Sequence, residues 1–233
     1  PPRRSAAPAP TPRGVAARSP TSGARGPTSF SPPVDTDAAQ PVAPDAVEDY
    51  YLVVSRLVPY KRFDLVIDAF NLLGLPLKIV GDGRARDDLE RRAGPTIQFL
   101  GTVSDEEKYR LYARCRAAIF PAEDDFGIAQ LEVQASGRPA IAYRAGGALD
   151  TVIDGETGVL FAPQSVDAIV AAVRRFEQMT FQPERMIQHA HRFSRARFDR
   201  EIRDFVDGML DVRRGQAGAH PARERLQEAT TWS

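Results

Sequence analysis

From Tyr50 onward, short apolar runs rich in β-branched residues alternate with stretches in which apolar residues recur at helical spacing. This alternation is typical of β-α-β units, whose parallel strands are buried on both faces. It constrains the fold more than any other feature of the sequence. We predict six strands, over residues 51–55, 77–80, 97–100, 117–120, 140–143 and 158–161. The expected fold is α/β, with a doubly wound, Rossmann-like parallel sheet.

Capping residues and apolar spacing place the helices. Apolar residues in the stretch 63–70 recur at helical spacing, and Gly74 is expected to end that helix. Ser104 and Glu107 form a capping-box pattern, in which each side chain bonds the other's backbone N–H, at the start of another helix. Ser165 has the chemistry of an N-cap for a third. Two further helices are predicted over residues 184–192 and 195–210.

Residues 1–45 differ in composition from the rest of the chain. They contain 11 of the 19 prolines and almost no large apolar side chain before Phe30. Such a segment cannot bury enough apolar surface to offset the conformational entropy lost on ordering. We therefore expect a disordered tail and linker over 1–45, a folded domain over 46–212 and a frayed tail over 213–233. The first thirty residues, rich in arginine and without acids, also resemble an organelle transit peptide, but their prolines would break its amphipathic helix.

Charge and cysteine content narrow the class of protein. Lysine plus arginine and aspartate plus glutamate each total 31, so the formal net charge is zero, and no nucleic-acid partner is expected. The single cysteine, Cys115, rules out an internal disulfide; it lies in an apolar helical pattern and is interpreted as a core residue. No apolar run approaches the roughly 20 residues that a membrane-spanning helix needs. These features favour a cytoplasmic protein.

Two cations follow the first predicted strand. Arg56 stands at the end of that strand and Lys61 near the start of the next helix. Ligands of doubly wound sheets bind outside the carboxyl ends of the strands, so this loop is a candidate site. Two cations there suit a diphosphate, because they neutralise the charge that grows as a phosphate leaves. The alternative is a pair of solvated surface cations, which the strand-end position disfavours.

A second loop follows the strand that ends at Phe120. It is acidic, and a helix opens near Gly127, where free backbone amides and the helix dipole form an anion site. Glu132 lies one turn beyond Ile128, and helical side chains lean toward the N-terminus. Its carboxylate is therefore placed to accept two hydroxyl hydrogen bonds, such as a ribose offers. The apolar neighbours of Glu132 disfavour the alternative of an exposed helical glutamate.

Three other patterns are weak by themselves. Gly146 and Gly147 follow the fifth strand, and Gly81-Asp-Gly83 follows the second, but glycine pairs usually make only tight turns. The acid pair in Asp35-Thr-Asp37 resembles a known metal-binding motif. No strand precedes it, so we interpret it as a turn and predict no metal site.

A set of motifs occurs in a fixed order along the chain: Arg56…Lys61, Gly81-Asp-Gly83, Asp124-Asp-Phe-Gly…Glu132, Ala135-Ser-Gly-Arg-Pro-Ala140, Gly146-Gly…Asp150 and Gly155-Glu-Thr-Gly158. The ordered set is specific, although each piece is weak alone. Over residues 32–206 the chain resembles the C-terminal, donor-binding half of the group 1 (family four) retaining glycosyltransferases, which have the two-domain GT-B fold. It looks most like bacterial enzymes that build surface polysaccharides, often mannosyltransferases.

The resemblance implies roles for individual residues. Arg56 and Lys61 would hold and stabilise the leaving diphosphate without a metal, and Asp124 would face the donor sugar; these three are the implied catalytic residues. Glu132 would bind the ribose, and the segment from Gly101 to Val103 would line the base pocket. The implied donor-binding residues are Gly81, Gly83, Val103, Phe126, Gly127, Ile128, Ala129, Glu132, Gly146 and Gly147. No cofactor is implied beyond the nucleotide diphosphate sugar that serves as donor substrate.

The chain also departs from the family pattern. Asp124 and Asp150 stand where the family usually has glutamate, and the shorter Asp124 reaches less far toward the sugar, although Glu123 is adjacent. Residues 32–37 look like the family's interdomain linker, yet no Rossmann-like domain precedes them. That domain would supply the acceptor site, so the expected unit is the donor-binding half alone.

The implied reaction is transfer of a sugar from a nucleotide diphosphate sugar to a hydroxyl acceptor, with retention, in surface polysaccharide or glycan synthesis. Two alternatives stay open: a nucleotide-sugar epimerase on the same architecture, and a non-catalytic donor-binding fragment or subunit of a split enzyme. The expected partners are a nucleotide sugar, a glycan or lipid-linked acceptor and a separate N-terminal acceptor-binding domain. Peripheral attachment at the inner face of the membrane is compatible with such an acceptor.

Overall fold

The structure is a computed structural model that describes residues 30–217, and side chains as far as residue 211. Its centre is a six-stranded sheet in the order β3-β2-β1-β4-β5-β6, with every neighbouring pair parallel. The strands are β1 (Tyr51–Val54), β2 (Leu77–Val80), β3 (Ile97–Gly101), β4 (Ala118–Phe120), β5 (Ala140–Tyr143) and β6 (Gly158–Phe161). All six predicted strands are confirmed, with ends that differ by at most one residue. The α/β, doubly wound fold is therefore confirmed.

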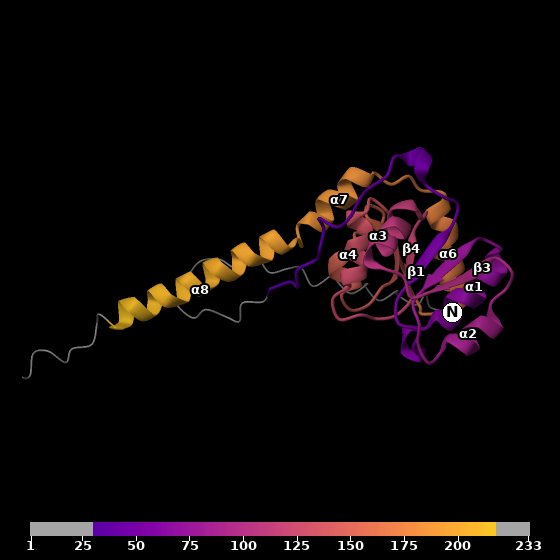
Figure 1. Cartoon of the computed structure of the whole chain (residues 1–233), viewed down its shortest axis with the longest axis horizontal. Coiled ribbons are helices and arrows are strands. Elements are labelled where there is room, and N and C mark those ends of the chain that lie inside the picture. Colours follow the sequence, from indigo (N-terminus) through magenta and orange to yellow (C-terminus); the bar gives the residue numbers. More distant parts are fainter. Residues whose placement is uncertain (1–29, 218–233) are drawn as a thin grey trace, which may run out of the picture.

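Helices cover both faces of this sheet (Figure 1). They are α1 (Phe63–Leu73), α2 (Arg86–Arg92), α3 (Asp105–Arg114), α4 (Ile128–Ala135), α5 (Ala148–Thr151), α6 (Val166–Glu177), α7 (Pro183–His191) and α8 (Arg195–Ala217), with short 3-10 turns η1 (Pro44–Ala46) and η2 (Pro59–Lys61). On one face α1 packs against α2 and α6; on the other, α3 packs against α4, which also contacts α7.

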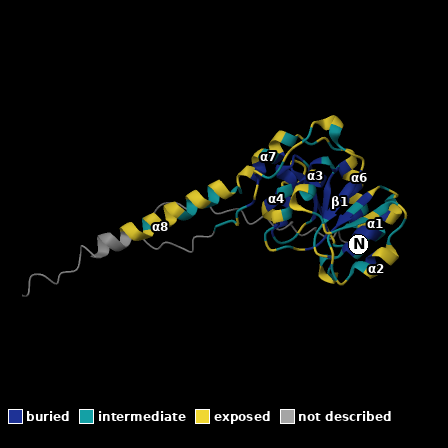
Figure 2. Cartoon of the chain, in the orientation of Figure 1, coloured by how far each residue is buried: buried dark blue, intermediate teal, exposed yellow. Residues whose placement is uncertain are grey.

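The strands are buried on both sides because each face contributes to a separate core cluster (Figure 2). Along β1, Tyr51 and Val53 point into the cluster beneath α1 and α6, whereas Leu52 points into the cluster beneath α3 and α4. Cys115 is fully buried in the second cluster, as predicted, although it lies one residue beyond the end of α3. Burial raises the pKa of its thiol to about 12.

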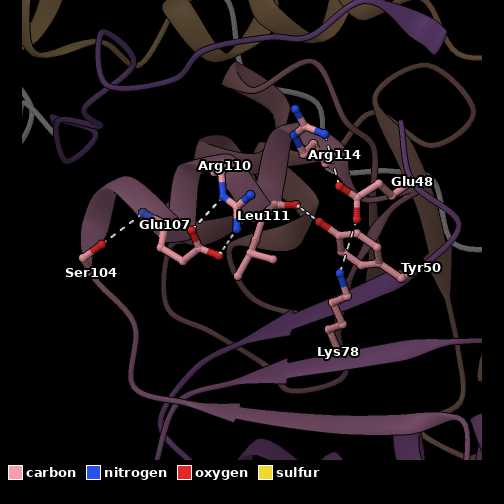
Figure 3. Close-up of polar contacts among 8 residues, drawn as sticks. All are labelled: Glu48, Tyr50, Lys78, Ser104, Glu107, Arg110, Leu111 and Arg114. Carbon is pink, nitrogen blue, oxygen red and sulfur yellow. Dashed lines mark hydrogen bonds and ion pairs between the residues drawn. The ribbon is translucent and has the colours of Figure 1, made fainter. Parts of the chain in front are cut away.

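The helix ends agree with the predicted caps, with one exception. Gly74 ends α1 in the left-handed conformation at φ 66°, which a side chain would strain, and the Ser165 hydroxyl accepts from the Ala168 N–H at 3.3 Å. The capping box predicted at α3 is confirmed for Ser104 and wrong for Glu107. Ser104 Oγ accepts from the Glu107 N–H at 3.2 Å, but the Glu107 carboxylate pairs with Arg110 at 2.6 and 2.7 Å instead of reaching back (Figure 3).

Residues 30–45, the described part of the segment expected to be a disordered tail and linker, lie against the domain. Val34 is 1% exposed, and its N–H donates to the Phe193 carbonyl at 2.9 Å, forming an isolated bridge with Ser194. Ala38 and Ala39 pack against the core cluster beneath α3 and α4. The rest of the predicted tail, residues 1–29, lies outside the described residues, as do residues 218–233 of the predicted frayed end.

The last helix, α8, runs outward from the rest of the molecule (Figure 1). It extends to Ala217, beyond the predicted domain end at residue 212. Phe205 lies on this helix, 36% exposed, and its ring meets that of Phe30 edge to face at 5.4 Å between centroids. Within residues 30–217, no helix has the length and apolar character needed to cross a membrane.

Candidate functional site

The site lies where the order of the strands reverses. β1 and β4 are neighbours that share only the register pair Leu52 and Ala118, and the chain leaves them toward opposite faces of the sheet, to α1 and to α4. The loops after the two strands therefore diverge and leave a crevice at their carboxyl ends, where doubly wound sheets bind ligands. The two most informative loops of the sequence border this crevice.

Lys61 and Asp124 meet across the crevice. The Lys61 ammonium forms an ion pair with Asp124 Oδ1, and the two side chains are 19% and 28% exposed. They border a cavity of about 50 Å³ between the ends of β1 and β4, which Phe63 and Ala129 also line. The structure thus brings together two of the three predicted catalytic residues.

Arg56, the third, is exposed and makes no ion pair with the residues that the structure describes. It lines a hollow of about 350 Å³ together with Tyr60, Gly83 and Arg84. Two guanidinium groups and no carboxylate line this hollow, so it favours an anionic ligand.

Gly81 and Gly83 fix the loop that carries Arg56. Gly81 has φ 125°, and a Cβ there would collide with the carbonyl oxygen of Ser55. A Cβ on Gly83 would meet the backbone of Leu57, whose N–H donates to the Asp82 carbonyl at 2.9 Å. In this ligand-free arrangement the two glycines allow close backbone packing beside the site.

The loop after β4 leads into α4 through Gly127, which has φ 91°, a conformation that favours glycine. α4 has no side-chain cap, and among the described residues none accepts a hydrogen bond from the N–H of Ile128 or Ala129. These amides and the positive end of the helix dipole form an anion-binding position beside Lys61. Phe126, just before it, is half-buried and contacts Phe193 at 5.9 Å between ring centroids.

The glycine pair after β5 supports this same loop. The Gly147 N–H donates to the Asp124 carbonyl at 2.7 Å, and a Cβ on Gly147 would collide with the backbone of Phe126. A Cβ on Gly146 would likewise collide with the Asp124 carbonyl. Two motifs that are far apart in the sequence therefore form one packed unit, and Asp150 stays exposed at its edge.

Glu132 is the most enclosed of the predicted polar residues, with 14% of its side chain exposed. Its Oε1 accepts from Lys108 Nζ at 3.3 Å and from the Tyr109 hydroxyl at 3.2 Å. It opens on a cavity of about 660 Å³ between α3 and residues 35–42. Sequence reasoning missed Tyr109, because spacing along α3 does not specify which residue of α4 it faces.

Two other predicted positions lie outside this cluster. Val103 follows β3, two strands from the crevice, and packs half-buried against the core cluster beneath α3. The segment Asp35-Thr-Asp37, interpreted as a turn, leads into a turn at residues 37–38, where the Ala38 N–H donates to Asp35 Oδ1 at 3.3 Å.

The family of the chain is established by comparison with known proteins. The family model of the group 1 glycosyl transferases matches residues 36–193, more than half of the chain, and the chain belongs to this family. Residues 36–193 include both loops of the crevice and the whole sheet.

The relatives are longer proteins. The chain is 30% identical over 134 residues to the O-antigen chain mannosyltransferase C of Escherichia coli, covering 54% of this chain and 36% of that protein. It is 33% identical over 170 residues to the GDP-mannose-dependent alpha-(1-6)-phosphatidylinositol monomannoside mannosyltransferase of Mycolicibacterium smegmatis, covering 61% of this chain and 44% of that one. The chain thus spans less than half the length of both relatives.

Solved structures share the fold. Anabaena Alr3699/HepE, solved in complex with UDP and glucose, superposes with a TM-score of 0.62 at 20% identity, over 75% of this chain and 55% of that one. The sucrose-phosphate synthase of Thermosynechococcus elongatus gives a TM-score of 0.68 at 21% identity, over 78% and 52% of the two chains. Both are similar to this chain in architecture, and they support the GT-B assignment.

Proposed function

We propose that this chain binds the nucleotide diphosphate of a sugar donor and supplies the donor half of a retaining glycosyl transfer to a hydroxyl acceptor. The observation that carries the proposal is the convergence, at the carboxyl ends of β1 and β4, of Lys61, Arg56 and the uncapped start of α4. Two cations and a helix N-terminus suit a diphosphate, whose charge grows as the glycosidic bond to it breaks.

The same geometry suggests how the leaving group is stabilised. Lys61 forms an ion pair with Asp124, and both border the cavity that Ala129 also lines, so the ammonium is already placed beside the start of α4. Preplaced charge needs little reorganisation during the reaction, which is why it lowers the barrier. Asp124, beside the diphosphate position, would face the sugar.

The remaining donor contacts follow from the order of the elements. Glu132 lies one turn into α4 from the anion position and would accept the ribose hydroxyls. The base would then lie toward the end of β3, along the segment from Gly101 to Val103. Gly81, Gly83, Gly146 and Gly147 would contribute by shaping the two loops rather than by side-chain contacts, since all four already pack against backbone.

Surface polysaccharide or glycan synthesis is the proposed process, and a glycan or lipid-linked hydroxyl the proposed acceptor. The support is the similarity to an O-antigen mannosyltransferase and to a phosphatidylinositol monomannoside mannosyltransferase. Both names specify mannose transfer, so a mannose donor is the first to test.

Calorimetric titration with UDP, GDP and ADP, each beside its own nucleoside, tests the donor site. We expect one diphosphate to bind at least about tenfold more tightly than its nucleoside, because charge-assisted hydrogen bonds contribute most of the affinity. Equal affinity of diphosphate and nucleoside would contradict a diphosphate site at the crevice.

A further inference from the structure

We infer that Tyr109 and Tyr112 are positioning residues for Glu132, and that their hydroxyl groups set how strongly the site discriminates a ribonucleotide from a dideoxynucleotide. This inference rests on the proposed donor site and deepens it. Neither tyrosine is placed in contact with the donor; both would act through the Glu132 carboxylate.

The two tyrosines form one packed pair on α3. Their rings meet edge to face, 6.2 Å between centroids, and both side chains belong to the core cluster between α3, α4 and the sheet. Tyr109 is 7% exposed and Tyr112 is fully buried. Because α3 packs directly against α4, this pair lies beside Glu132, and Tyr109 lines the cavity on which Glu132 opens.

The Tyr109 hydroxyl has two acceptors but a single proton. It lies 3.2 Å from Glu132 Oε1 and 3.1 Å from the Asp35 carbonyl. Lys108 also donates to Oε1, at 3.3 Å, and its ammonium lies 4.7 Å from the Tyr109 ring centroid. Both donors thus contact the same oxygen, and among the described residues none donates to Oε2. The carboxylate is clamped at one oxygen, and the other is left for a ligand.

The second observation that supports the inference concerns the Tyr112 hydroxyl. It is buried without a hydrogen-bond partner among the described residues, which costs free energy in any folded chain. Burial raises the pKa of Tyr112, and the nearby Glu132 charge raises it further, so the phenol stays a neutral donor. A small movement of Glu132 on ligand binding would give this proton an acceptor. The orphaned hydroxyl therefore fits a site whose hydrogen bonds are completed only with the ligand.

The physical benefit is preorganisation. A glutamate side chain has several rotamers, and fixing one on binding costs conformational entropy. The Tyr109 hydroxyl, which donates to Glu132 Oε1 at 3.2 Å, selects the rotamer before the ligand arrives. The gain appears only for ligands that use Glu132, which separates this role from a contribution to packing.

The test compares the affinity of UDP and GDP with that of their 2′,3′-dideoxy counterparts, by calorimetry, for the unaltered chain, Tyr109→Phe and Tyr112→Phe. Each substitution removes only a hydroxyl and keeps the ring. We expect the affinity for the ribonucleotide to fall about tenfold and that for the dideoxynucleotide to change less than about twofold. In the Glu132→Ala background, adding Tyr109→Phe should cost almost nothing more, because the carboxylate that accepts the Tyr109 proton has already been removed.

Tyr50→Phe is the matched control. Tyr50 belongs to the same core cluster, is 3% exposed, and donates its hydroxyl proton to the Leu111 carbonyl at 2.9 Å, away from Glu132 (Figure 3). It should lower stability without changing the ratio of the two affinities. Equal losses for both nucleotides in the Tyr109 and Tyr112 variants would overturn this inference alone. Absence of binding by any nucleoside diphosphate to the unaltered chain would overturn the proposed function with it.

Discussion

At the residue scale, the loop that follows β1 carries a paired cation and an unpaired one. Lys61 contacts Asp124, whereas Arg56 has no acidic partner among the described residues. The first arrangement fixes a charge in place, and the second leaves a charge to be neutralised by an incoming anion. Together they favour a ligand with two phosphates, one near each cation.

Replacing Lys61 with alanine removes the placed charge and leaves Asp124 unpaired beside the phosphate position. We expect the affinity for the nucleoside diphosphate to fall about 10- to 100-fold, with little change in nucleoside affinity, because a charge-assisted hydrogen bond is lost and a like charge is exposed. Calorimetry with both ligands measures the difference. Lys78→Ala is the control, since Lys78 pairs with Glu48 at 3.4 Å on another part of the sheet (Figure 3). Comparable losses for both ligands would contradict the role of Lys61.

Some of these residues could be found from sequence and others could not. Arg56 and Lys61 were identifiable because they follow a buried strand directly, and strand ends of a parallel sheet share one edge. Gly81 and Gly147 gave only weak signals. Gly81 packs against the backbone of Ser55 and Gly147 against that of Phe126, and such contacts join segments far apart in the chain. Tyr109 depends on how α3 faces α4, which spacing along one helix does not specify.

At the scale of elements, the strands were predictable because five of the six have buried residues on both faces, which produces mainly apolar runs. The exception, β3, has half-buried apolar residues at the edge of the sheet. α2 (Arg86–Arg92) was not predicted. Leu89 is its only buried residue, so it has no apolar periodicity. Its charged residues instead make four salt bridges: Arg86 with Asp82 and Glu90, Arg91 with Asp88, and Arg92 with Asp68. A helix held mainly by polar contacts leaves little trace in a hydrophobic pattern.

Asp154, in the connection between α5 and β6, accepts several hydrogen bonds. Asp154 accepts from the Leu160 N–H at 3.0 Å, from Arg144 at 2.8 Å and from Arg175 at 2.9 Å. Burial alone would raise the pKa of Asp154, but these hydrogen bonds outweigh it and lower the pKa. Because the folded pKa is below the unfolded one, the stabilisation is complete above the unfolded value, near 4, and is lost as pH falls through the folded value.

Asp154→Asn should therefore lower the free energy of unfolding by about 1 kcal/mol at pH 7, since two ion pairs are lost and the bond to the Leu160 amide is kept. The difference from the unaltered chain should shrink below about pH 4, where the Asp154 carboxylate of the unfolded chain begins to protonate, and disappear as pH falls through the lower folded pKa. Urea denaturation at pH 7 and pH 3 measures it. Asp87→Asn, at an exposed aspartate with no salt bridge among the described residues, should show a smaller effect with no such trend. A constant difference at both pH values would argue against this account.

At the scale of the whole molecule, the groups assigned here all serve the donor. The chain covers 55% of Anabaena Alr3699/HepE and 36% of the Escherichia coli mannosyltransferase, so large parts of both proteins lie outside the aligned region. In a two-domain cleft the facing domain holds the acceptor hydroxyl near the anomeric carbon, and such proximity contributes roughly 7–11 kcal/mol to the barrier reduction.

We therefore expect the 233-residue chain, assayed by itself, to bind a nucleotide sugar and to transfer no sugar above background. A radiolabelled transfer assay with the purified chain and extracts containing candidate acceptors, run beside a binding titration, measures both properties. Robust transfer by this chain alone would show that it holds an acceptor as well as a donor.

The contact of Val34 with Phe193 and Ser194 has a practical consequence for protein engineering. The segment between these residues contains the whole sheet, and its two ends are adjacent, joined by the hydrogen bond of 2.9 Å from the Val34 N–H to the Phe193 carbonyl. A unit with neighbouring ends can be spliced into a surface loop of a host protein with little distortion of either partner. Inserted into a fluorescent protein in this way, it is a candidate scaffold for a genetically encoded sensor of nucleotide sugars, whose signal would report how donor binding shifts its two ends.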